Sequence, residues 1–252
     1  MLALIRILLA GSVFFAVSFL IIPFMIFRPF HPDNGPLYCR LFAPLCLKIL
    51  GIKVITKNIE TLKESAPCIY LGNHQGSLDV CLLGYVHPWK TVSIGKKELI
   101  YIPGFGQVYW LSGHVLIDRF AKNKAISTLE KVKEKLQKNK VSIWVLPEGT
   151  RSRGRGLLPF KKGAFHMAIS AQVPLKPIVI SSFYGKMNYN RWHAGTILIE
   201  ALDEISTKGK TSEDLDDLIN QAHHAYENKL AEMDKEIAIL DNRATKKVVS
   251  VL

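Results

Sequence analysis

A histidine and an aspartate, His74 and Asp79, lie five residues apart just after the apolar run at residues 68–71. That run predicts a buried strand, and residues 78–86 predict a helix. His74 is therefore expected in the turn at a strand's carboxyl end, where open α/β sheets bind their ligands. At this spacing the Asp79 carboxylate can accept a hydrogen bond from one imidazole nitrogen and leave the other free as a base. A base without its own nucleophile suits a reaction in which the substrate supplies the hydroxyl, although the pair alone is more often an ordinary loop feature.

A second stretch that could bind a ligand is formed by residues 148–156. It follows the apolar run 141–146 and carries three arginines among glycines and hydroxyls. Glycine lets backbone amides approach a bound group closely, and arginine can hold a phosphate through two parallel hydrogen bonds. The stretch therefore predicts a phosphate clamp, to which Lys161, Lys162 and Arg119 could add. The phosphate-binding loop of nucleotide-hydrolysing enzymes and the nucleophile elbow of serine hydrolases are both absent from the sequence.

Composition points to an anionic partner, because the 252 residues carry a net charge of +12. Nearly all of the excess lies in residues 86–162, which hold 16 lysines and arginines and five acidic residues. A nucleic acid is disfavoured as that partner, since no nucleic-acid-binding motif is present and the amino-terminal part is apolar. The four cysteines show no paired spacing, which indicates reduced residues and neither a disulfide framework nor a zinc site.

The amino-terminal segment predicts a membrane helix, because residues 7–27 contain no charge. As a helix these residues would be about 31 Å long, enough for a hydrocarbon core of about 30 Å. A cleaved signal peptide is disfavoured by the length of the apolar run and the lack of a cleavage site. Pro23 leaves open a re-entrant hairpin in place of a span. Residues 36–51 predict a half-polar helix that lies either in the membrane interface or in the core.

The remaining elements predict an α/β fold, in which helices flank a layered sheet and an amino-terminal helical segment associates with the membrane. A further helix is expected at residues 122–140 and a long one at 213–239, the latter with Thr211 and Asp214 as a capping box. The expected division is a membrane helix plus amphipathic helix at 1–52, an α/β domain at 53–241 and a polar tail at 242–252. Strands are expected at residues 52–55, 68–71, 91–94, 115–117, 141–146, 175–180 and 196–202.

Four ordered segments, at residues 73–79, 113–119, 146–152 and 173–178, carry a resemblance to a known family. Together they resemble the four blocks of the glycerolipid acyltransferases, and the chain is most similar to the bacterial 1-acylglycerol-3-phosphate O-acyltransferases, the lysophosphatidic acid acyltransferases. The departures are small: Leu146 stands where phenylalanine is commoner, and Leu175 and Lys176 replace a more uniformly apolar pair.

The resemblance implies that His74 is the general base, oriented by Asp79, in the transfer of an acyl chain from a thioester to the free hydroxyl of 1-acylglycerol 3-phosphate. The product would be phosphatidic acid, made for phospholipid synthesis. Glu148 matches one of the family's acceptor-binding blocks, but it could hold an arginine in place in preference to binding the acceptor. No metal and no cofactor are implied; acyl-coenzyme A or acyl carrier protein would bring the acyl chain as co-substrate. The positions that match the family's acceptor-binding blocks are Arg119, Glu148, Gly149, Thr150 and Arg151.

The implied partners are membrane lipid, lysophosphatidic acid and the acyl-coenzyme A or acyl carrier protein donor, with no nucleic acid. The implied location is the bacterial inner (cytoplasmic) membrane with the active site on the cytoplasmic face, where acyl thioesters are made. Glycerol 3-phosphate or another lysophospholipid is an alternative acceptor, and a membrane-bound lipid hydrolase is an alternative activity.

Overall fold

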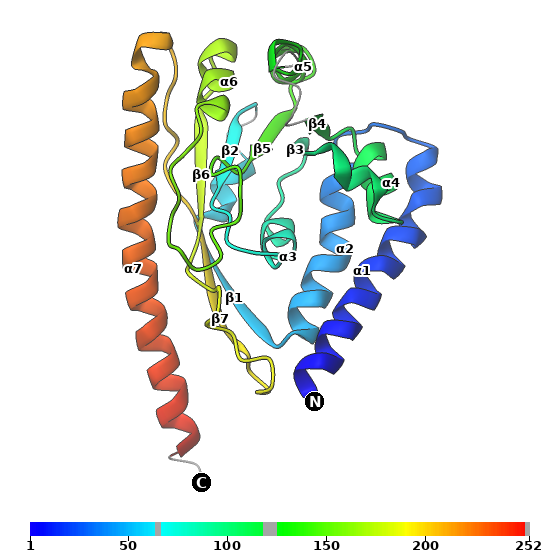
Figure 1. Cartoon of the computed structure of the whole chain (residues 1–252), viewed down its shortest axis with the longest axis vertical. Coiled ribbons are helices and arrows are strands. Elements are labelled where there is room, and N and C mark those ends of the chain that lie inside the picture. The colour runs from blue at the N-terminus through cyan, green and yellow to red at the C-terminus, as the bar shows by residue number, and fades with distance from the viewer. Residues whose placement is uncertain (64–66, 118–124, 250–252) are drawn as a thin grey trace.

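The computed structural model describes residues 1–63, 67–117 and 125–249. Their centre is a seven-stranded sheet with the strand order β1-β7-β6-β2-β5-β3-β4 (Figure 1). All seven strands predicted from the sequence are present, with ends shifted by at most two residues. Their bounds are β1 (Ile52–Lys57), β2 (Ile69–Gly72), β3 (Thr91–Lys96), β4 (Val115–Ile117), β5 (Ser142–Val145), β6 (Leu175–Ile180) and β7 (Gly195–Ala201).

Strand direction decides which loops meet. The strand β2 pairs in parallel with both β5 and β6, and β3 pairs in parallel with β5 and β4. Only β7 and β1 run the other way, because β7 is antiparallel to β6 and parallel to β1. The carboxyl ends of five adjacent strands therefore lie along one edge, which includes the loops after β2 and β5 that contain the predicted chemistry.

The sheet is the middle of three layers, because successive strand residues point to opposite faces. Tyr70 and Trp144 join the core under the helices α1 to α4, whereas Ile69 and Ile143 join the core under α5 to α7. Figure 1 shows α7 along one side of the sheet and the α1–α2 pair along the other. The α-helices are α1 (Leu2–Ile26), α2 (Asn34–Ile49), α3 (Asp79–Tyr85), α4 (Phe105–Leu111), α5 (Ala125–Gln137), α6 (Gly163–Ala171) and α7 (Leu215–Val249). The 3-10 helices are η1 (Ile59–Lys63), η2 (Lys97–Tyr101) and η4 (Ser212–Asp214).

Three helical features differ from the sequence prediction. The short helices α4 and α6 were not predicted, because seven and nine residues are too few to show a clear apolar period. The predicted capping box of Thr211 and Asp214 is present, but it opens η4, and α7 follows from Leu215. The helix α7 also continues through the polar segment expected to be a tail and ends at Val249, well beyond the predicted end at residue 239.

Helix α1 has the length and apolar composition to cross a membrane, and it is only 17 % buried over its most apolar window. One face packs on the domain: the Phe14 ring lies 5.2 Å from that of Phe42 in α2 and 5.3 Å from that of Phe105 in α4, centroid to centroid. The helix α2, left open above as interfacial or internal, is a core helix that buries Phe42 and Cys46. The opposite face of α1 exposes large apolar side chains, namely Leu4, Ile5, Leu8, Leu9, Phe15, Phe19, Leu20 and Phe24.

The start of α1 is held to the domain by Arg6, which is only 6 % exposed. Its guanidinium donates to the backbone carbonyls of Arg191 at 2.6 Å and Trp192 at 2.8 Å, both in the connection between β6 and β7. It also lies over the Trp192 ring, 5.6 Å from the centroid. A buried guanidinium needs several acceptors, and a bend in the backbone supplies them here. The Arg6 side chain therefore helps to fix the first turns of α1 to the domain, together with the Ala3 amide, which donates to the Asn190 side chain at 3.0 Å.

Replacing Arg6 with alanine should detach the start of α1 and leave buried carbonyls unpaired. Hydrogen bonds to a charged group contribute about 1.5–3 kcal/mol each, so we expect a loss of roughly that size in the free energy of unfolding. Arg6→Lys should rescue little, because an ammonium does not match the planar fork. Thermal unfolding in detergent measures the loss. Arg191→Ala is the matched control, since that residue supplies only its carbonyl; equal melting temperatures for both variants would contradict the assignment.

Candidate active site

The structure brings His74 and Asp79 together as the spacing predicts. The imidazole Nδ1 and the Asp79 Oδ2 are 2.6 Å apart. His74 lies two residues beyond β2, and Asp79 is the first residue of α3. The aspartate side chain is 2 % exposed and the histidine side chain 20 % exposed. The pair thus consists of a buried carboxylate and an imidazole that remains accessible at the carboxyl edge of the sheet.

The surroundings of Asp79 decide which imidazole nitrogen carries the hydrogen. Its Oδ2 also accepts the backbone amides of Gln75 at 2.7 Å and Gly76 at 2.9 Å. Donors that converge on one oxygen favour an ionised carboxylate, which can only accept. The His74 Nδ1 must therefore donate. Among the described residues Nε2 has no hydrogen-bond partner, so its lone pair is available to take a proton.

Glu148, in the loop after β5, ties that loop to the one after β2. Its Oε1 accepts the His74 amide at 2.6 Å and its Oε2 accepts the Leu158 amide at 3.1 Å. Ser152 completes the contact by donating its amide to the His74 carbonyl at 2.8 Å. Burial raises the pKa of Glu148 above its ordinary value, and the two amide hydrogen bonds oppose that rise. This carboxylate holds two backbone amides, and among the described residues it has no arginine partner.

Gly149 follows in a left-handed backbone conformation, with φ of +68°. A side chain there would meet Lys161, since an added Cβ would lie 2.8 Å from its Cδ and 2.9 Å from its ammonium nitrogen. Glycine at this position therefore lets Lys161 cross directly above the turn. The sequence placed Lys161 only at the end of the basic stretch, and the structure puts it beside the residues after β5.

The remaining predicted phosphate-binding residues lie at the surface of the same loop. Thr150 and Arg151 are both exposed, and in the described part of the chain the Arg151 guanidinium has no hydrogen bond or ion pair. Arg155 instead shapes the loop, because its guanidinium donates to the carbonyls of Ser152 at 2.8 Å and Arg151 at 3.1 Å. Arg119, the other predicted ligand, lies outside the described residues.

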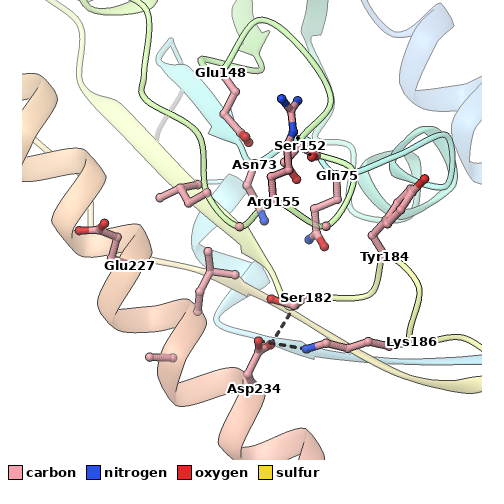
Figure 2. Close-up of a pocket in the computed structure, with 15 residues that line it drawn as sticks. Asn73, Gln75, Glu148, Ser152, Arg155, Ser182, Tyr184, Lys186, Glu227 and Asp234 are labelled. Carbon is pink, nitrogen blue, oxygen red and sulfur yellow. Dashed lines mark hydrogen bonds and ion pairs between the residues drawn. The ribbon is translucent and has the colours of Figure 1, made fainter.

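Two amide side chains that the sequence analysis did not single out hold the histidine loop from behind. Asn73 exchanges two hydrogen bonds of 2.8 Å with the backbone of Ile180 at the end of β6. Gln75 binds the backbone just beyond that strand. Both line a cavity of about 500 Å³ between the loops and α7 (Figure 2). Its lining mixes Arg155 and Lys186 with three acidic residues and excludes His74, so this cavity does not have the charge of the expected phosphate clamp.

Comparison with known proteins matches the chain to one family. The family model described as Acyltransferase matches residues 53–181, which include the loops after β2 and β5. The 1-acyl-sn-glycerol-3-phosphate acyltransferase of Haemophilus influenzae is 43 % identical over 208 residues, covering 82 % of this chain and 86 % of the relative. The Escherichia coli protein of the same name is 40 % identical over 215 residues, covering 85 % and 87 %.

A solved structure matches the fold as well. The crystal structure of the 1-acyl-sn-glycerophosphate acyltransferase from Thermotoga maritima superposes with a TM-score of 0.69 at 26 % sequence identity. The match covers 91 % of this chain and 97 % of that one. The likeness therefore includes the helices as well as the sheet.

Glu148→Gln should loosen the histidine loop. The glutamine amide group would face one of the two backbone N–H groups as a second donor, leaving it unpaired at a cost of about 1–3 kcal/mol. We expect a loss of that size in the free energy of unfolding, together with loss of activity. Denaturant unfolding measures the loss in the free energy of unfolding. Glu60→Gln, at an exposed glutamate, serves as control. An unfolding midpoint for Glu148→Gln equal to that of the wild-type protein would show that the hydrogen bonds of Glu148 do not stabilise the loop.

Proposed function

Because the chain belongs to the acyltransferase family, we propose that it transfers an acyl chain from a thioester to the free hydroxyl of 1-acylglycerol 3-phosphate. The names of the relatives from Haemophilus influenzae and Escherichia coli support this acceptor. The observation that carries the proposal is the His74 and Asp79 pair, in which Nδ1 binds a buried carboxylate and Nε2 has no hydrogen-bond partner among the described residues. The acyl donor is acyl-coenzyme A or acyl carrier protein.

The reaction follows from that arrangement. His74 Nε2 takes the proton of the acceptor hydroxyl as its oxygen attacks the thioester carbonyl. Asp79 stabilises the imidazolium that forms and keeps the ring oriented. Collapse of the tetrahedral intermediate breaks the carbon–sulfur bond, and the imidazolium returns its proton to the departing thiolate. The acyl chain moves directly to the acceptor, so no residue needs to carry it covalently.

Acceptor recognition belongs to the basic loop after β5. The Arg151 guanidinium, which has no partner in the part of the chain that the structure describes, would form a bidentate pair with the acceptor phosphate. Arg151 directly precedes Ser152, whose amide binds the His74 carbonyl, so the Arg151 backbone lies beside the histidine loop, which supports its proposed role in holding the phosphate near the base. Lys161 adds positive charge across Gly149. Arg119 and Thr150 complete the proposed set.

The exposed apolar face of α1 gives the enzyme access to a substrate that stays in the membrane. The helix lies along the domain, and Arg6 fixes its first turns. Inserting its outer face into the lipid would place the sheet edge at the surface of the bilayer. The basic excess of the chain suits an anionic leaflet, and we place the active site on the cytoplasmic face of the inner membrane.

His74→Ala should abolish turnover. General-base catalysis contributes roughly 10²- to 10⁴-fold, and we expect a fall in kcat of that order. The measurement is thiol release from acyl-coenzyme A or acyl carrier protein by the detergent-purified protein, with lysophosphatidic acid, glycerol 3-phosphate or no acceptor. Release that requires lysophosphatidic acid and is lost in the variant supports the proposal. Thiol release with glycerol 3-phosphate but not with lysophosphatidic acid would identify glycerol 3-phosphate as the acceptor. Thiol release without any acceptor would indicate a hydrolase.

Arg151→Ala should weaken acceptor binding while leaving the base intact. A charge-assisted bidentate contact is among the strong hydrogen-bonded pairs, so the KM for lysophosphatidic acid should rise by about tenfold or more. The KM for the thioester should change little. Lys208→Ala removes an exposed positive charge elsewhere and is the control for a general effect of charge. Equal KM values for the two variants would remove Arg151 from the acceptor site.

A further inference from the structure

The segment at the end of β6 and just beyond it is hydrogen-bonded to the catalytic loop through Gln75. The Gln75 Nε2 donates to the carbonyls of Ile180 at 3.1 Å and Ser181 at 2.9 Å. Its Oε1 accepts the amide of Phe183 at 2.9 Å. The backbone amide of Gln75 itself donates to Asp79. Gln75 therefore links the Ile180–Phe183 backbone to the carboxylate that orients His74.

Helix α7 in turn holds that segment. Asp234 accepts the amide of Ser182 through Oδ1 at 2.9 Å, and its Oδ2 lies 3.2 Å from the ammonium of Lys186 (Figure 2). The two contacts fall on either side of Phe183, whose amide binds Gln75. A carboxylate on the C-terminal helix thus fixes the backbone to which the catalytic loop is bound.

A second contact from α7 reaches the strand that leads to His74. The Tyr226 hydroxyl donates to the carbonyl of Leu71 at 2.6 Å and accepts the amide of Ile178 at 3.2 Å, so it bridges β2 and β6. Pro177, which is paired with Leu71, has no N–H to contribute to this ladder. Tyr226 is fully buried, and its ring packs edge-to-face on that of Phe160 at a centroid distance of 5.2 Å.

These contacts share one consequence for the reaction. Leu71 lies three residues before His74, and Gln75 lies directly after it, so α7 holds the backbone on both sides of the base. We propose that α7 positions the His74 and Asp79 pair, with Tyr226 and Asp234 as its two positioning residues. The inference rests on the function proposed above and adds to it a role for the C-terminal helix.

The test compares each positioning variant with a matched control in the full-length protein. Tyr226→Phe removes only the hydroxyl, and Tyr70→Phe removes the hydroxyl of another buried tyrosine, which donates to the Leu62 carbonyl in η1. Asp234→Ala removes the contact with Ser182, and Glu236→Ala removes a different α7 ion pair, to Lys57. Asp234→Asn keeps an oxygen that can accept the Ser182 amide.

Tyr226→Phe and Asp234→Ala should lower kcat by about 10- to 100-fold, because small displacements of catalytic groups are costly. The KM for lysophosphatidic acid should stay within about twofold, since its binding loop is intact. Asp234→Asn should keep most of the wild-type kcat. Hydrogen exchange at the Gln75 and Gly76 amides, which bind Asp79, should accelerate in the first two variants and remain unchanged in both controls.

Two results would overturn the proposal. One is a kcat for Tyr226→Phe and Asp234→Ala equal to that of their controls; the other is unchanged exchange at residues 75 and 76 in both variants. Failure of the proposed function would look different, because the wild-type protein would then show no turnover that depends on lysophosphatidic acid. The exchange comparison needs no turnover and would still decide the role of α7.

Discussion

One carboxylate oxygen, Oδ2 of Asp79, is the point on which the site depends. It accepts hydrogen bonds from the His74 imidazole and from the backbone amides of Gln75 and Gly76. It therefore fixes both the orientation of the imidazole ring and the conformation of the turn that carries it. A buried carboxylate needs hydrogen-bond donors, and three converge on Oδ2, whereas Oδ1 has none among the described residues. That requirement makes the loop rigid, and rigidity is what a base needs to meet a substrate hydroxyl in one geometry. Glu148 serves the same purpose from the neighbouring loop through the His74 amide.

The parallel sheet brings together these distant parts of the chain. Because β2 lies between β5 and β6, the loop with the base lies between the loop with the basic residues and the segment that binds Gln75. Each loop completes the hydrogen bonds of its neighbour: Ser152 donates to His74, and Phe183 donates to Gln75. Substitutions in the loops after β5 and β6 therefore act on the base as well as on their own segments, and their energetic effects should not add independently.

The two outer layers differ in character, and the difference matches the proposed setting. On one side α1 keeps an apolar face exposed, although its inner face and Arg6 bind it to the domain. On the other side α7 presents a polar outer surface and buries Tyr226 against the strands. Lipid contact by α1 and support of the catalytic loop by α7 would then divide two tasks between opposite faces of one sheet.

The sequence by itself determined the strands, the long helices and the pairing of His74 with Asp79, because these follow from local periodicity and from a spacing of five residues within one turn. It did not reveal α4 or α6, which are too short for a period and depend on tertiary packing. Nor did it identify Gln75, Tyr226 and Asp234 as supports of the loop. Their partners are backbone groups up to 155 residues away in the chain, and any polar side chain can bind a backbone amide or carbonyl. Only the order of the strands decides which of those groups comes within reach.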